Sequence, residues 1–299
     1  MSDIHFNRGS IAVLGASGQL GHNLVSTLGD AVVPFTRLDC DLLSKASIEQ
    51  ALCSHHFEWV INAAAYTNVD GAESDPDTCL GINHLAVGHI AEICQRRGSK
   101  LVQVSSDYVF GGDLSRKTPY RETDPTAPQG VYATSKLLGE QAAKLCDHHL
   151  ILRTCGLYAA QNANGTFKNF CNTILAASLK RSELSIVNDQ WCTPTYVPHL
   201  VSAIETLIKM NASGTYHVVN EGQTNWYAFG SRLLSLAGIK TPVIPISSAE
   251  YRSAVIRPQY SVLDTSKFVS DTGRSLPTWE EGLAQYVRQQ PLPSPAQAI

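Results

Sequence analysis

The segment IAVLGASGQLGHNLVSTL, residues 11–28, decides the fold that the sequence predicts. IAVL indicates a buried strand, and HNLVSTL has the period of an amphipathic helix. A glycine-rich turn between a first strand and its helix lets backbone N–H groups approach a pyrophosphate at the helix N-terminus. The spacing G-x-x-G-x-x-G also leaves open a plain glycine-rich loop. The turn residues expected to contact a dinucleotide are Gly15, Ser17, Gly18, Gln19 and Leu20.

The alternation of strand and helix continues along the chain. Apolar runs rich in β-branched residues recur at 32–35, 59–62, 100–105 and 150–153, with helical segments between them. Asp75 and Pro76 are typical of an N-cap and a first helical residue, and we expect that helix to run to about Arg97. This order predicts an α/β fold, a Rossmann-type doubly wound parallel sheet.

Beyond residue 155 the alternation becomes less regular. Helices are expected near 165–181, 196–209, 225–237 and 277–289, and strands at ELSIV, TYHVV and PVIPI. We therefore expect a dinucleotide-binding domain over 1–155, completed by parts of 184–220. A smaller C-terminal substrate-binding lobe is expected from 156–183 and 221–290, and a disordered tail over 291–299.

Composition narrows the classes of partner. The 299 residues carry a formal charge of -3 and a pI near 6.4, without clustered Lys or Arg, which argues against nucleic acid and membrane as partners. Eight Cys without a C-x-x-C pair indicate reduced thiols and no metal site. MSDIHFNRGS lacks a secretory apolar region, and no 18-residue apolar run follows, so we expect a soluble cytoplasmic protein. Monomer and homodimer both stay open.

The ends of the expected strands supply further candidate ligand contacts. Arg37 follows the second strand, where a guanidinium would favour the 2′-phosphate of NADP, although a solvated loop arginine is equally consistent. Asp41 and Leu42 lie where this loop could reach an adenine ring. The remaining candidates at strand ends are Ala63, Ala64, Ala65, Ser105, Ser106 and Asp107.

Tyr132 and Lys136 stand four residues apart in VYATSKLLGE, at the start of the next expected helix. Alone, this spacing is also that of an ordinary surface pair. With the strand ends at Ser106 and Ala63–Ala65, it predicts a site in which Lys136 lowers the phenol pKa and Tyr132 passes a proton to a substrate oxygen.

Taken together, these segments resemble the extended branch of the short-chain dehydrogenase/reductase superfamily, and within it the dTDP-4-dehydrorhamnose reductase family. The resemblance is carried by GASGQLG, INAAAYTNVDGAESDP, VSSDYVFGG, PYRETDPTAPQGVYATSKLLGE, ILRT, NDQWCTPT and RPQYSVLD. It implies that Ser106, Tyr132 and Lys136 form a catalytic triad, with Tyr132 and Lys136 also at the cofactor. The substrate contacts that it implies are Val69, Ser106, Asp107, Tyr108, Tyr132, Gly156 and Arg257.

The resemblance implies NAD(P)H-dependent reduction of the C4 ketone of a nucleotide-linked 6-deoxysugar. The expected substrate is dTDP-4-dehydro-L-rhamnose and the product dTDP-L-rhamnose, with NADPH as cofactor and NADH left open. A non-catalytic subunit similar to the methionine adenosyltransferase β subunit, and another sugar-nucleotide reductase or epimerase, stay as alternatives. A 4,6-dehydratase would need a second carboxylate where the chain has Ser106-Asp107-Tyr108.

Two positions depart from the family pattern. Related reductases carry Trp in R-T-S-W-V-Y, where this chain has Gly156, and Cys192 stands where Gly is usual. The loss of an indole predicts a wider and less selective sugar pocket. Tyr158 or Trp191 could fill the gap, a bulkier sugar could occupy it, or catalysis could be relaxed.

Overall fold

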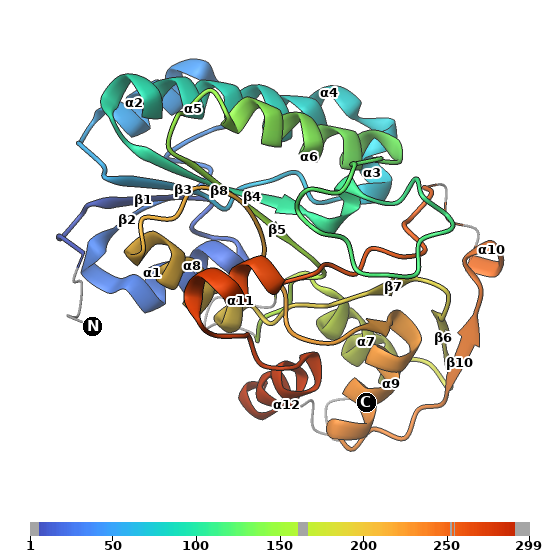
Figure 1. The fold of residues 1–299 in the computed structure, drawn as a ribbon. Helices are drawn as coiled ribbons and strands as arrows, with labels where there is room; N and C mark the ends of the chain where they lie inside the picture. The colour runs from blue at the N-terminus through green and yellow to red at the C-terminus, as the bar shows by residue number, and fades with distance from the viewer. Residues whose placement is uncertain (1–5, 161–166, 252, 254, 291–299) are drawn as a thin grey trace.

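The computed structural model describes residues 6–160, 167–251, 253 and 255–290 (Figure 1). The expected tail, 291–299, lies outside these ranges. No helix in this described part of the chain combines the length and apolar character that a membrane crossing requires.

A six-stranded parallel sheet forms the centre of the molecule, in the order β2-β1-β3-β4-β5-β8. This order confirms the Rossmann-type α/β fold that the sequence predicts. The strands β1, β3, β4 and β5 are deeply buried because helices cover both faces, which explains their continuous apolar runs. The bounds are β1 Ile11–Leu14, β2 Val32–Phe35, β3 Trp59–Asn62, β4 Lys100–Ser106, β5 His149–Thr154 and β8 Gly214–His217.

Helices lie on both faces of this sheet, as Figure 1 shows, with α2, α5 and α6 on one face and α1, α8 and α11 on the other. Each face has its own apolar core, and Ile11 and Ala12 of β1 point into opposite ones. The carboxyl ends of the strands therefore meet at one edge, where ligands bind in such folds. The bounds are α1 Gln19–Leu28, α2 Lys45–Cys53, α5 Ala86–Arg97, α6 Gly130–Ala143, α8 Val197–Lys209 and α11 Ser266–Thr272.

The expected long helix from Pro76 to Arg97 is present, but it is interrupted. Asp75 caps it by accepting a hydrogen bond from the Thr78 N–H at 3.3 Å. It runs as α4, Pro76–Leu80, then a π-helical turn over Gly81–Leu85, then α5. Single π turns frequently mark functional positions, and this one carries Asn83.

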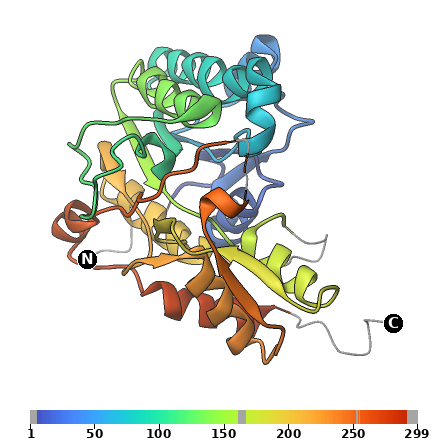
Figure 2. The ribbon, with the colours of Figure 1, turned by 90° about the vertical axis from the view of Figure 1, so that its right-hand side faces the viewer.

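A smaller C-terminal lobe packs below the sheet. It contains two small sheets, in which β6 pairs with β10 in parallel and β7 with β9 in antiparallel. Figure 2 shows the yellow β6 beside the orange β10 at the lower part of the molecule. The expected helix near 165–181 is shorter, because described helical structure begins only after the N-cap Asn169. The bounds are α7 Phe170–Ser178, β6 Leu184–Val187, β7 Trp191–Cys192, β9 Thr224–Asn225, α9 Trp226–Leu236, β10 Val243–Ile246 and α12 Trp279–Gln289.

Residues 255–264, here called the strap, return from this lobe to the sheet. The strap is bonded to both parts: Ser261 donates its N–H to the carbonyl of Trp191, and Tyr120 donates its N–H to Val262 at 2.8 Å. It therefore brings residues far along the chain to the carboxyl edge of the sheet. The short helices around this edge are α3 Val69–Ser74, α10 Ser248–Tyr251 and the 3-10 turn η3 Asp107–Val109, while the 3-10 turn η1, Gly29–Ala31, precedes β2.

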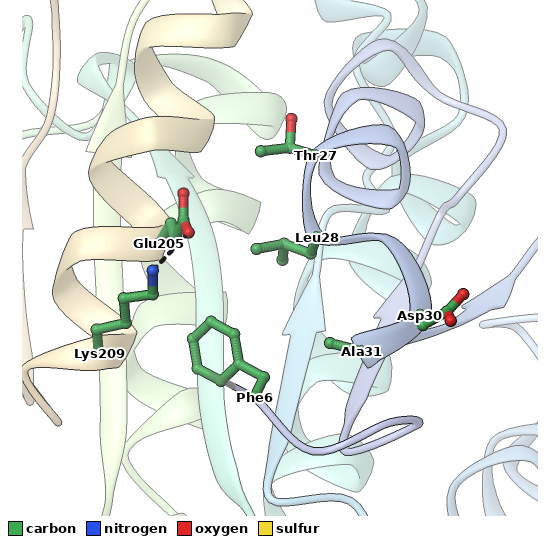
Figure 3. Close-up of a pocket in the computed structure, with 7 residues that line it drawn as sticks. All are labelled: Phe6, Thr27, Leu28, Asp30, Ala31, Glu205 and Lys209. Carbon is green, nitrogen blue, oxygen red and sulfur yellow. Dashed lines mark ion pairs between the residues drawn. The ribbon is translucent and has the colours of Figure 1, made fainter. Parts of the chain in front are cut away.

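Two surface hollows lie away from the predicted site. One, of about 290 Å³, opens between η1 and α8, where the Glu205–Lys209 ion pair faces Leu28 (Figure 3). The other, of about 690 Å³, lies beside β8 and α11 and is lined by Arg121 and Lys267. Neither is lined by a residue that the sequence predicts for the site.

Candidate active site

The turn between β1 and α1 fits a dinucleotide phosphate. Gly15 has φ of 75°, and a Cβ there would lie 2.8 Å from the backbone N and Cα of Ala64. Glycine is therefore required both for the backbone conformation and for the close approach of the loop after β3. Gly18 is the N-cap of α1 and supplies no side-chain cap, so the N-terminus of this ten-residue helix presents backbone N–H groups to an anion.

The other predicted residues of this turn have different surroundings. Ser17 is exposed beside Gly18, while the Leu20 side chain packs in the core. The Gln19 side chain donates to the Leu157 carbonyl at 3.0 Å and accepts a hydrogen bond from Asn169 at 3.3 Å. Gln19 thus ties the turn to the loop after β5 and to the start of α7.

On the adenosine side, Arg37 is exposed just beyond β2. The N–H and hydroxyl of the preceding Thr36 both donate to Asp39, which lowers the pKa of that carboxyl. Asp41 accepts a hydrogen bond within its own turn, and the Leu42 side chain is buried in the core. Arg37 is therefore placed to reach a ligand, whereas Leu42 could offer mainly its backbone.

Ser106 and Tyr132 meet at the carboxyl end of β4. Ser106 Oγ donates to Asp107 Oδ1 at 3.1 Å and accepts from the Tyr108 N–H at 3.2 Å. Burial raises the pKa of Tyr132, and a hydrogen bond with Ser106 acts in the opposite direction without overcoming burial. The phenol is thus held in its protonated form beside a hydroxyl.

Lys136 lies one turn further along α6 and is only 4% exposed. Its Nζ donates to the Val104 carbonyl of β4 at 2.7 Å. Burial lowers its pKa to about 8, against the opposing charge of Glu140. Burial of the phenol is the larger effect on Tyr132 and raises its pKa, so a contribution of Lys136 in the opposite direction stays a prediction.

A buried ion pair that the sequence reading missed supports this helix face. Glu140 follows Lys136 by four residues on α6, and Arg153 Nε and Nη2 donate to its two oxygens at 2.8 and 2.7 Å. Ser105 adds a third hydrogen bond to Glu140 at 2.6 Å. The regular spacing Y-x-x-x-K-x-x-x-E was the signal that could have found Glu140, because it repeats on one helical face.

Asn83, in the π turn, is a second missed residue. Its Oδ1 accepts from the Tyr66 N–H at 2.9 Å, and its Nδ2 donates to the Tyr66 carbonyl and to Ser135 Oγ, both at 3.0 Å. These bonds fix the loop that follows Ala63–Ala65 against the helix that carries Tyr132. Nothing in the hydrophobic period of the sequence signals the π turn.

Asp107 is enclosed in the protein. Its carboxylate accepts from Ser106 and, at 2.6 Å, from Ser261 Oγ of the strap. Burial raises the pKa of Asp107, although hydrogen bonds from Ser261, the Cys155 thiol and Ser106 oppose that rise. Both oxygens are thus engaged by the protein, which suits a residue that orients Ser106.

Among the other predicted substrate contacts, Tyr108 packs edge-on against Tyr132, with ring centroids 5.5 Å apart at 84°. Arg257 of the strap comes to the same place and pairs with Asp70 at 2.8 Å. Val69 begins α3 directly before Asp70. The structure thus brings Tyr108 and Arg257 together beside Tyr132, while Val69 is next in the chain to the ion-pair partner of Arg257.

Gly156 corrects the expectation of a wider pocket. A Cβ at Gly156 would lie 2.9 Å from Cη2 of Trp226, so the indole of Trp226 already fills this space. Gly156 also has φ of 49°, which disfavours any larger residue. Neither expected aromatic supplies the contact, since Tyr158 is buried in the core of the C-terminal lobe and Trp191 projects from β7 with 39% exposure.

A glycine-rich turn between β1 and α1, with Ser, Tyr and Lys at the carboxyl edge of a six-stranded parallel sheet, is typical of the extended short-chain dehydrogenase/reductase class. The model of the RmlD substrate binding domain family matches residues 9–291. The chain belongs to this family, that of the dTDP-4-dehydrorhamnose reductases.

Known relatives are similar over nearly their whole length. The dTDP-4-dehydrorhamnose reductase of Burkholderia thailandensis is 35% identical, over 93% of this chain and 98% of its own. Spore coat polysaccharide biosynthesis protein SpsK of Bacillus subtilis is 32% identical, over 93% and 97%. The crystal structure of dTDP-4-dehydrorhamnose reductase from Bacillus anthracis in complex with NADP has a TM-score of 0.89 and 34% identity, over 95% and 100%.

Proposed function

We propose that this protein reduces the C4 ketone of a nucleotide-linked 6-deoxysugar, converting dTDP-4-dehydro-L-rhamnose to dTDP-L-rhamnose with NADPH. The observation that carries the proposal is the meeting of Ser106 and the protonated Tyr132 above the buried Lys136. The named activity of the Burkholderia thailandensis and Bacillus anthracis relatives supports the substrate, and the NADP of the latter supports the cofactor.

The residues of this chain fit NADPH. Gly15, Ser17 and Gly18 would hold its pyrophosphate at the start of α1, and Arg37 would pair with its 2′-phosphate. The small side chains of Ala63–Ala65 leave room for the nicotinamide half, whose ribose Lys136 would bind. When bound, NADPH supplies the hydride for the ketone carbon.

The side chains of the site supply the proton. Tyr132 donates it to the ketone oxygen, and its raised pKa keeps the phenol protonated at neutral pH. On substrate binding, Ser106 turns its single hydroxyl proton from Asp107 to the same oxygen and stabilises its developing charge. Lys136, with a pKa of about 8, is charged at neutral pH and stabilises the phenolate that remains.

The surrounding groups keep these three in place. Glu140 and Arg153 anchor the helix face that carries Tyr132 and Lys136. Asp107 orients the hydroxyl of Ser106 by accepting its hydrogen bond. We assign them positioning roles because protein donors already engage both carboxylate oxygens of Glu140 and of Asp107, and Arg153 is bonded to Glu140.

The test is NADPH oxidation by the purified protein, followed by absorbance, with dTDP-4-dehydro-L-rhamnose as substrate and dTDP-L-rhamnose as the unreactive control. Rapid oxidation with the keto sugar alone supports the proposal. The similarity to SpsK, a spore coat polysaccharide biosynthesis protein, favours testing further 4-keto sugar nucleotides as second candidate substrates. NADPH binding without oxidation by any keto sugar would support a regulatory subunit instead.

A further inference from the structure

An ion pair joins the strap to α3 beside the candidate site. Arg257 Nη2 donates to both carboxylate oxygens of Asp70, at 3.0 and 2.8 Å, although the two residues stand 187 positions apart. Ser253 Oγ donates to the same carboxylate at 3.4 Å. Asp70 thus accepts hydrogen bonds from Arg257 of the strap and from Ser253, which precedes the strap.

The two partners differ in their surroundings. The side chain of Asp70 is 58% exposed, while that of Arg257 is 26% exposed. Arg257 Nε is buried and has no hydrogen-bond acceptor among the described residues. The guanidinium therefore keeps donor capacity that Asp70 does not use, and its planar fork suits phosphate oxygens.

Arg257 is also coupled to the catalytic tyrosine. Burial tends to lower the pKa of Arg257, but interactions with Tyr108 and Asp70 outweigh it and raise that pKa. Tyr108 in turn packs against Tyr132. Only the side chain of Tyr108 therefore separates Arg257 from Tyr132, and a ligand that draws the guanidinium away from Asp70 would bind close to Tyr132.

We propose that Asp70 is a specificity-determining residue that holds Arg257 until the diphosphate of a nucleoside diphosphate-sugar displaces it. This inference rests on the proposed function, which supplies the diphosphate. An exposed carboxylate gives an ion pair of little net stability, so the exchange costs little. A diphosphate offers more oxygens and more negative charge than one carboxylate, whereas an uncharged sugar offers no competing anion.

The experiment measures binding of dTDP alone by titration calorimetry. Asp70→Asn should bind dTDP about 3- to 10-fold more tightly than the wild type, because the competing carboxylate is gone. Arg257→Lys keeps the charge without the fork and should bind more weakly. The matched control is Asp77→Asn, which removes an equal charge from exposed α4 and should change the affinity less than twofold.

A double variant separates competition from simple repulsion. If Asp70 acts by holding Arg257, the gain from Asp70→Asn should vanish in an Arg257→Gln background, which offers no cation for Asp70 or the diphosphate to compete for. An equal gain in that background, or weaker binding by Asp70→Asn alone, would overturn the inference and leave the proposed function intact. Failure of the wild type to bind dTDP would overturn both.

Discussion

The two sides of the candidate site are built in different ways. On the catalytic side, Tyr132, Lys136 and Glu140 repeat every four residues on one helix, and Ser106 ends the strand beside it. On the side formed by the C-terminal lobe and strap, contacts join residues far apart in the chain, as in Gly156 against Trp226, 70 positions further on. Helix and strand spacing fixes the positions of the residues on the catalytic side. On the other side, the positions depend on how distant segments of the chain pack together.

The largest effect should come from breaking the support of the catalytic side. Glu140→Gln leaves the buried Arg153 without its counter-charge and should lower the free energy of unfolding by about 3 to 5 kcal/mol, measured in urea. Glu49→Gln is the matched control, because its partner Arg96 is 56% exposed, and it should cost about 1 kcal/mol or less. Equal losses for the two variants would show that the buried Glu140–Arg153 pair contributes no more to stability than an exposed pair.

The next largest effect tests the chemistry on that side. Tyr132→Phe should lower kcat at least about 100-fold, equivalent to roughly 2.7 kcal/mol of barrier, because the positioned acid is lost. NADPH affinity should stay near that of the wild type. Tyr227→Phe, on α9, is the control for removing a hydroxyl. Turnover by the Tyr132 variant close to the wild-type rate would contradict its role as proton donor.

A third prediction tests whether Arg37 contacts the 2′-phosphate of NADPH, as the sequence predicts. Arg37→Ala should weaken NADPH binding by about 1.5 to 3 kcal/mol and leave NADH binding almost unchanged, because only NADPH carries a 2′-phosphate. Arg8→Ala removes the same charge from an exposed position ahead of β1 and serves as control. An equal loss for the two cofactors would assign Arg37 to the fold.

The smallest expected effect concerns the packing of Gly156 against Trp226 on the side of the C-terminal lobe. Gly156→Ala combines a left-handed backbone with the Trp226 contact, whereas Gly98→Ala has φ of 69° and no heavy atom near its new Cβ. Gly156→Ala should therefore cost about 1 kcal/mol more unfolding free energy than Gly98→Ala. Trp226→Phe in the same chain should reduce the difference. Equal losses of unfolding free energy for the two variants would mean that the Trp226 indole can move aside without cost.

The features that could be predicted from the sequence are those set by residues close together in the chain. The glycine turn at Gly15, the helix cap at Asp75 and the strand runs all follow from neighbours in the chain, and the structure has each of them. Trp226 could not be predicted, because α9 reaches Gly156 only through the packing of the lobe. The rise in the pKa of Tyr132 could not be predicted, because burial depends on every element around the phenol.

The central claim is hydride transfer to C4 of the keto sugar, and isotope transfer tests it most directly. The protein is incubated with dTDP-4-dehydro-L-rhamnose and NADPH that carries deuterium at both nicotinamide C4 positions, and the product is examined by NMR. The account predicts dTDP-L-rhamnose with one deuterium at sugar C4. A product without deuterium at C4, or an unchanged keto sugar in the presence of bound NADPH, would contradict it.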